Sequence, residues 1–127
     1  MQLELLSVLA FILATASSIT AQTALSGSHY ANYTTLNLET QQSKSGDRLK
    51  PNGLNNRTPP INVGPLQCWH IVRSESVFSI LCKGKRWNQF TDCSNGYRYT
   101  LGPLSGVIKT TIECPNKTIA LRGGAFS

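Results

Sequence analysis

The chain has 127 residues, a formal net charge of +6 and 14% charged residues, which excludes two sizeable domains. Leu5–Ala16 is apolar and uncharged, and small polar residues follow it up to Ala21, as in a secretory signal peptide. This run is too short to cross a bilayer as a helix, because a span needs about 20 residues. We therefore predict a signal peptide over residues 1–21 and a soluble, secreted, extracellular mature protein. Cleavage after Ala16 or Ser18 fits the small-residue rule better than cleavage after Ala21, where Ile19 is still tolerated, so the mature start stays open.

The next part of the chain is predicted to be a polar, low-complexity arm. Residues 22–62 contain no cysteine or tryptophan and are rich in Ser, Thr, Asn, Gln and Gly. Such a stretch buries too little apolar area to offset its chain entropy, so we expect it to be mostly disordered or loosely attached. One part could add an edge strand to the domain. The side chains that would form it are Tyr30, Tyr33, Leu36 and Leu38.

The remaining residues, 63–127, are predicted to form a compact β-domain that folds alone. They contain short apolar or alternating segments bounded by turn-prone residues. The predicted strands are 66–72, 77–83, 86–91, 97–101, 107–112 and 118–122. The predicted turns are Gly84, Ser94-Asn95-Gly96, Gly102-Pro103, Ser105-Gly106 and Pro115-Asn116. This spacing favours an all-β fold, a small antiparallel β-sandwich or barrel of about six strands with a flexible N-terminal arm.

The cysteines all lie in the predicted β-domain. They are Cys68, Cys82, Cys93 and Cys114. A domain this small usually needs covalent crosslinks, and export to an oxidising compartment permits them, so we predict two disulfides. The spacing contains no C-x2-C pair and disfavours a zinc site. A catalytic thiol would be expected to stand alone beside a histidine, which these cysteines do not. We predict no metal and no cofactor.

The disulfide connectivity stays open among three options. A hairpin that turns at residues 74–76 would place Cys68 opposite Cys82, and a second hairpin would bring Cys93 near Cys114. The nested alternative pairs Cys68 with Cys114 and Cys82 with Cys93. We favour the nested arrangement slightly, because a bridge that spans the whole domain restricts the unfolded chain most, by roughly 3–4 kcal/mol in the chain-entropy model.

Three N-x-T sequons could accept glycans in a eukaryotic secretory pathway. Their acceptors are Asn32, Asn56 and Asn116. The first two lie in the predicted arm and the third lies in a predicted turn, all exposed positions of the kind that a glycan requires. We expect occupancy at Asn32 and Asn56, and less at Asn116 because its Thr118 begins a predicted strand.

A basic, aromatic-containing cluster is the candidate binding site. It comprises Lys83, Lys85, Arg86 and Trp87, with Arg98 further along the chain. On a predicted hairpin tip these residues could bind phosphate backbones, acidic glycans or an anionic membrane surface. Lysines on a solvated tip also discourage edge-to-edge pairing, which explains the same residues without a ligand. Trp87 could belong to the core instead of the surface.

The chain offers little for catalysis, and we predict no catalytic residue. The histidines are His29 and His70, and no nucleophile-elbow, H-E-x-x-H or paired-carboxylate motif appears. A metal-independent ribonuclease needs histidine, arginine and glutamate around a phosphate. His70, Arg73, Glu75 and Arg98 contain the right types. A strand histidine is more often a packed or surface residue, so an enzyme is the minority interpretation.

The organisation of the chain resembles that of the small secreted cysteine-containing effector proteins of plant-associated fungi. Those proteins combine a signal peptide, a polar arm and a basic, cysteine-stapled β-domain. Residues 63–127 resemble the MAX-type β-sandwich effectors in strand count and size. Cys68 lies where the first cysteine of that group would, with Cys93 or Cys114 as its partner. The second cysteine pair and the long arm depart from the pattern.

The resemblance implies a virulence-related binding protein that engages a host protein and modulates host defence without catalysis. The resemblance also allows translocation into host cells, and we expect a monomer. Two other functions stay open. One is a small cationic toxin or antimicrobial protein that acts on anionic membranes. The other is a ribonuclease-like protein that binds RNA.

Overall fold

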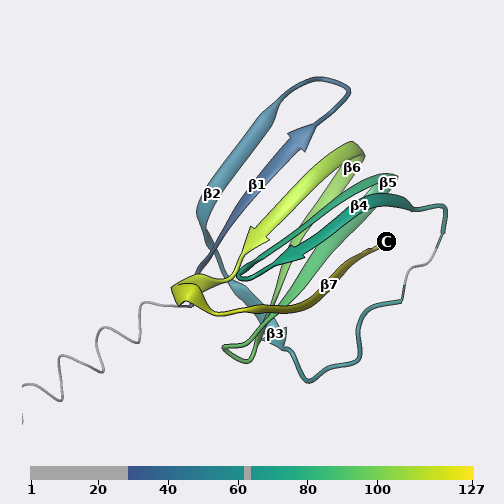
Figure 1. Ribbon diagram of the computed structural model, residues 1–127. Coiled ribbons are helices and arrows are strands. Elements are labelled where there is room, and N and C mark those ends of the chain that lie inside the picture. Colours follow the sequence, from purple (N-terminus) through teal and green to yellow (C-terminus); the bar gives the residue numbers. More distant parts are fainter. Residues whose placement is uncertain (1–28, 62–63) are drawn as a thin grey trace, which may run out of the picture.

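The computed structural model describes residues 29–61 and 64–127, and Figure 1 shows their arrangement. The predicted signal peptide and residues 22–28 of the predicted arm lie outside this part. The elements are β1 (Ala31–Asn37), β2 (Ser43–Leu49), β3 (Pro51–Leu54), β4 (Gln67–Ser74), β5 (Val77–Cys93), β6 (Tyr97–Glu113), the short 3-10 helix η1 (Pro115–Lys117) and β7 (Ala120–Phe126). All strand pairs are antiparallel, which confirms the all-β fold class. No helix among the described residues is long and apolar enough to span a membrane.

A long hairpin of β5 and β6 organises the fold. Each strand has 17 residues, and together they absorb four of the predicted strands. The turn between them contains Asn95, as predicted, and the Asn95 Oδ1 accepts a hydrogen bond from the Tyr97 N–H at 3.1 Å. The turns predicted at Gly84, Gly102-Pro103 and Ser105-Gly106 are wrong, because the ladder between β5 and β6 continues through all of these positions.

Two β-bulges of opposite sense interrupt this ladder. At the first bulge, Lys85-Arg86 on β5 faces the single residue Ser105 on β6. At the second bulge, Gly102-Pro103 on β6 faces the single residue Asn88 on β5. The two extra residues cancel, so beyond the bulges the strands return to their original register. Bulges bend a strand and increase its twist, so the hairpin curves over itself here.

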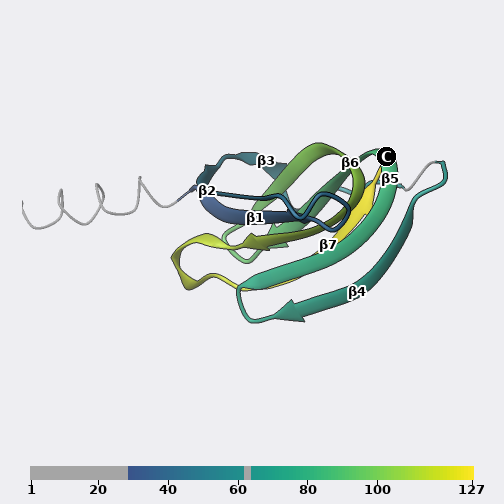
Figure 2. The same cartoon turned by 90° about the horizontal axis from the view of Figure 1, so that it is seen from above.

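The bent hairpin contributes each of its strands to two packed sheets (Figures 1 and 2). The five-stranded sheet has the order β2-β1-β6-β5-β4 and uses residues 108–113 and 77–83 of the hairpin. The four-stranded sheet has the order β3-β6-β5-β7 and uses residues 97–99 and 88–93. The curved hairpin therefore belongs to both sheets and joins them into a small β-sandwich.

The core lies between these sheets. Along β5 the buried side chains alternate, with Phe78, Ile80 and Cys82 directed inward, and Trp87 continues the core beyond the first bulge. The core cluster comprises Ala31, Phe78, Ile80, Cys82, Trp87, Cys93, Tyr99, Ile108, Ile112, Cys114 and Ala120. A hydrogen bond of 3.0 Å from the Gln89 side-chain amide to the Phe78 carbonyl connects the two halves of β5 across the core.

The predicted arm differs from the structure over residues 29–61, which supply three of the seven strands. Strand β1 is not an edge strand, because it pairs with β2 on one side and with β6 on the other. The expectation of a loosely attached arm is therefore wrong for this stretch. Strand β2 is mostly exposed and polar, so its order comes from backbone pairing with β1 and leaves no hydrophobic pattern in the sequence.

The disulfides confirm two bridges but not the favoured connectivity. The pairs are Cys68–Cys82 and Cys93–Cys114, so the nested arrangement is wrong. Cross-strand register decides the first pair, since Cys68 lies directly opposite Cys82 in the β4–β5 hairpin with their Cα atoms 4.0 Å apart. The second pair joins the ends of β5 and β6. Bridges of this kind are typical of extracellular or secreted proteins, and they leave none of the four thiols for zinc.

Candidate binding site

The structure separates the residues of the predicted basic hairpin. Lys83, Lys85 and Arg86 are exposed, but they lie in the middle of β5 at the first bulge and not at a hairpin tip. Trp87 has none of its surface exposed and belongs to the core. Arg98 is 5% exposed on the four-stranded sheet. The hairpin interpretation is therefore wrong, and only the three exposed cations remain available to a ligand.

Arg98 has a structural role in a buried ionic network. Its guanidinium donates to both carboxylate oxygens of Asp92, at 2.6 and 2.9 Å, and this hydrogen bonding raises the pKa of Arg98. It also donates to the carbonyl oxygens of Arg57 and Thr58, at 3.1 and 3.2 Å. Arg122 adds a second ion pair to Asp92. These contacts attach the segment after β3 to the four-stranded sheet.

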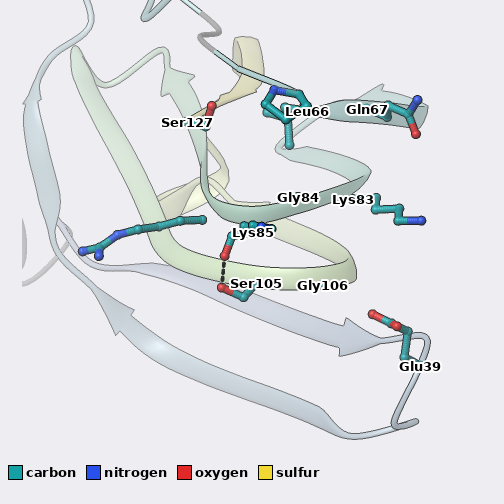
Figure 3. A pocket seen from close by; sticks show the side chains of 11 residues that line it. Glu39, Leu66, Gln67, Lys83, Gly84, Lys85, Ser105, Gly106 and Ser127 are labelled. Carbon is teal, nitrogen blue, oxygen red and sulfur yellow. Dashed lines mark hydrogen bonds between the residues drawn. The ribbon is translucent and has the colours of Figure 1, made fainter.

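Lys83, Lys85 and Arg86 line a cavity of about 850 Å³ beside the first bulge (Figure 3). Pro65 and Leu66 form an apolar wall of this cavity. Figure 3 shows the Leu66 side chain directed toward the strand that carries Gly84, while Lys83 extends away from it. The bulge is held by a hydrogen bond from the Ser105 hydroxyl to the Lys85 carbonyl. We call this the bulge cavity.

Most of the charged side chains that line the bulge cavity are cationic. Glu39 is its one carboxylate side chain, and the Glu39 Oε1 already accepts a hydrogen bond of 3.1 Å from the Val107 N–H. In residues 29–61 and 64–127, both ion pairs involve Asp92. Lys83, Lys85 and Arg86 consequently have no salt bridge within the part of the chain that the structure describes.

A second candidate surface lies on the five-stranded sheet, on the face that is turned away from the core. A row of side chains crosses four strands there. Trp69 on β4 pairs with Leu81 on β5. Leu81 also pairs with Lys109 on β6, and Lys109 pairs with Leu36 on β1. Directly paired residues point to the same face of a sheet. Because the next residue, Cys82, is buried in the core, this row points away from the core. We call the surface around these four residues the outer face.

The outer face is exposed at Trp69 and Lys109 and half-buried at Leu36 and Leu81. Trp69 retains 42% of its accessible surface and Val72 retains 52%. In Figure 2 no described strand lies beyond β4 and β5 on this side of the sandwich. Lys83 and Lys109 lie exposed on the same face, and Glu113 lies at its far end. An exposed tryptophan in an apolar row with cations beside it is a common feature of protein-binding surfaces.

The sequence did not single out the outer face, although one signal was present. Once Cys68 is taken as inward-pointing, strand alternation turns the neighbouring Trp69 to the outside. That step required the Cys68–Cys82 pairing, which places Cys68 opposite the buried Cys82 in the β4–β5 hairpin. The nested connectivity, which we favoured, does not define which residues of this hairpin lie opposite each other.

The residues proposed for a ribonuclease do not form one site. His70 is exposed on β4 with a φ of 48°, at a register irregularity between β4 and β5. Glu75 lies in the turn after β4, and the Arg73 guanidinium donates to the Ala120 carbonyl at 3.1 Å. Arg98 is occupied by Asp92 in the other sheet. His29 contributes its carbonyl, which accepts a hydrogen bond of 2.7 Å from the Tyr99 hydroxyl.

The sequon asparagines Asn32, Asn56 and Asn116 are all exposed. Asn32 lies on β1 opposite Glu113, on the outer face, and Asn56 lies in the turn after β3. Asn116 lies in η1, and Thr118 precedes β7 instead of beginning it. Occupancy of the three sites stays a prediction.

A scan of protein-family models found no matching family, and searches of curated proteins and of solved structures found no similar protein. No relative therefore bears on the resemblance to fungal effectors.

Proposed function

We propose that this is a secreted binding protein of effector type, which engages a host protein through its outer face and modulates host defence without catalysis. The single observation that carries the proposal is the row from Trp69 to Leu36, which crosses four strands on a face where Trp69 is exposed. The resemblance of the chain organisation to fungal effectors supplies the expectation of a host. The two disulfides support an extracellular route.

The chemistry of the outer face favours a particular kind of partner. Trp69 offers a large apolar surface at low cost in side-chain entropy, and such residues dominate the energetics of protein interfaces. Its position is fixed by the backbone of β4, which the adjacent Cys68–Cys82 bridge ties to β5. Lys83 and Lys109 beside it favour a partner with an apolar centre and acidic residues around that centre.

The experiment compares Trp69→Ala with a matched control, Leu54→Ala, which removes an exposed apolar side chain from β3 in the other sheet. Both variants should keep the thermal melt of the native protein. We expect Trp69→Ala to lose at least tenfold in defence-modulating activity when applied to challenged plant tissue, while Leu54→Ala keeps it. A photo-crosslinking residue at position 109 should capture a host protein that the same residue at Lys50 does not.

The salt dependence of binding separates this proposal from its alternatives. A packed protein interface should lose little affinity between low and high salt, whereas adsorption to anionic membranes or RNA should weaken steeply. Full activity of folded Trp69→Ala, together with steep salt dependence and lysis of anionic vesicles, would replace the proposal with the cationic toxin. Hydrolysis of RNA that His70→Ala abolishes would replace it with the ribonuclease.

A further inference from the structure

We propose that the bulge cavity binds a small amphiphile that has one anionic head group and one aliphatic chain. The bulge cavity shares none of the four residues of the row that carries the proposed function, although Lys83 lies on the outer face and also lines the cavity. A cavity of about 850 Å³ falls within the roughly 300–1,000 Å³ that is usual for small-molecule sites.

The apolar wall is built by the approach of the segment before β4 to the bent hairpin. A Cβ added at Gly84 would come within 2.9 Å of the Leu66 side chain and 3.1 Å of the Trp87 indole. The absence of a side chain at Gly84 therefore lets Leu66 lie directly against β5, with Pro65 beside it. An aliphatic chain that covered this wall would remove apolar surface from water.

The anionic head group follows from the charge around this wall. The first bulge places the consecutive residues Lys85 and Arg86 opposite Ser105, and Lys83 precedes them on the same strand; all three line the cavity. None of the three has a salt bridge in the described residues, because both ion pairs there use Asp92. Glu39 cannot neutralise them all, and its Oε1 is directed to the Val107 N–H. A ligand carboxylate or phosphate would complement the excess positive charge.

The backbone of the bulge keeps this arrangement in place without the ligand. The Ser105 hydroxyl donates to the Lys85 carbonyl, and Gly106 adopts a φ of 104° that a residue with a side chain rarely tolerates. A Cβ at Gly106 would also lie 3.0 Å from the Glu39 Oε1. The bulge and the β1–β2 turn are therefore fitted to each other on one side of the cavity.

Calorimetric titration of the full secreted protein tests the proposal with three probes: dodecanoate below its micellar concentration, dodecanol and acetate. We expect dodecanoate to bind, dodecanol to bind at least tenfold more weakly and acetate not to bind. The double variant Lys85→Glu/Arg86→Glu should weaken dodecanoate at least tenfold. Leu66→Ser should weaken both long-chain probes, which tests the apolar wall independently of charge.

The matched control is Lys50→Glu/Lys117→Glu, which changes the net charge equally at exposed positions outside the cavity and should leave dodecanoate binding unchanged. Vesicles distinguish two sources of the amphiphile. Competition by anionic but not zwitterionic phospholipid vesicles indicates a bilayer lipid, and no competition indicates a free amphiphile. The proposal is overturned if dodecanoate does not bind, or if its binding is equal in the native protein and both cavity variants. Loss of dodecanoate binding with normal Trp69-dependent activity would leave the proposed function intact.

Discussion

Arg98 and Asp92 form a bidentate ion pair inside the protein, with the Arg98 Nε 2.6 Å from the Asp92 Oδ1 and the Nη2 2.9 Å from the Oδ2. Both side chains are almost completely buried. Arg98 also lies over the Phe90 ring, with its Cζ 4.9 Å from the ring centroid. A buried charge of this kind is stable only while its partner is present.

Asp92→Ala is therefore expected to lower the free energy of unfolding by about 3–5 kcal/mol, because it leaves the Arg98 charge buried without a counterion. Denaturant unfolding measures the change. Asp47→Ala is the matched control, since Asp47 is exposed on β2, and should change stability by less than about 0.5 kcal/mol. Equal stability of the two variants would contradict the role of the network.

Residues 64–127 alone should fail to fold cooperatively, in contrast to the expectation from composition. Without β1, strand β6 loses a partner along six register pairs, and Arg98 loses the carbonyl oxygens of Arg57 and Thr58. A chain of residues 29–127 should keep a cooperative thermal transition. Circular dichroism melts of the two fragments, both oxidised, make the comparison. A sharp transition in the shorter fragment would show that β1–β3 are dispensable.

Removal of the two disulfides should raise hydrogen exchange in different parts of the protein. Their sequence separations of 14 and 21 residues are similar, so each should contribute about 3 kcal/mol in the chain-entropy model. Among the described residues, strand β4 pairs with β5 alone, so Cys68→Ser/Cys82→Ser should raise hydrogen exchange mainly in residues 67–74. Cys93→Ser/Cys114→Ser should raise exchange in both sheets. Identical exchange maps for the two variants would contradict this difference.

Gly123→Ala should destabilise the protein by about 1–3 kcal/mol through overpacking. A Cβ at Gly123 would lie 2.6 Å from two atoms of the Phe78 ring, which is fixed in the core. Phe78→Leu removes that ring, so the double variant should cost less than the sum of the two single variants. Denaturant midpoints of the four proteins measure this coupling, and strict additivity would argue against the contact.

Stability should fall at alkaline pH because of Tyr99. Burial is the main cause that raises the pKa of the Tyr99 phenol above its usual value of 10.0. A raised pKa means that the folded state favours the neutral phenol, so this contribution is present below pH 10 and is lost as pH rises through the raised pKa. The decline in unfolding free energy above pH 10 should be shallower in Tyr99→Phe. Parallel pH profiles would contradict the assignment.

Local signals in the sequence sufficed for the fold class and for three turns, of which Pro115-Asn116 lies in η1 between β6 and β7. The Ser94-Asn95-Gly96 turn and the reversal after Ser74 depend on residues adjacent in the chain, and both occur as predicted. Gly84 and Gly102-Pro103 have the same composition as turns, but the chain continues through them as bulged strand. Only the pairing with the partner strand distinguishes a bulge from a turn, and that pairing involves residues distant in the sequence.

The candidate binding site was harder to predict than the fold, because whether a residue can contact a ligand depends on its exposure in the folded protein. Arg98 and Trp87 were grouped with the exposed lysines, since an arginine or a strand tryptophan gives no sign of its exposure in the sequence. Strand β2 gave no apolar alternation, and its order depends on backbone bonds to β1. These features depend on long-range contacts, which sequence periodicity does not contain.

The opposed bulges also constrain how the chain can change in length. Deleting one residue at Lys85-Arg86 would leave a single residue opposite Ser105, so the flanking pairs Gly84–Gly106 and Trp87–Leu104 would be kept and the first bulge would be lost. A deletion at Gly102-Pro103 would likewise leave one residue opposite Asn88 and remove the second bulge, and the two deletions together would remove the bend. A deletion in the regularly paired parts of the hairpin would instead turn core residues such as Cys93 to the other face. In related chains, single-residue gaps in this hairpin are therefore expected at the two bulges, a position that aligned sequences would reveal.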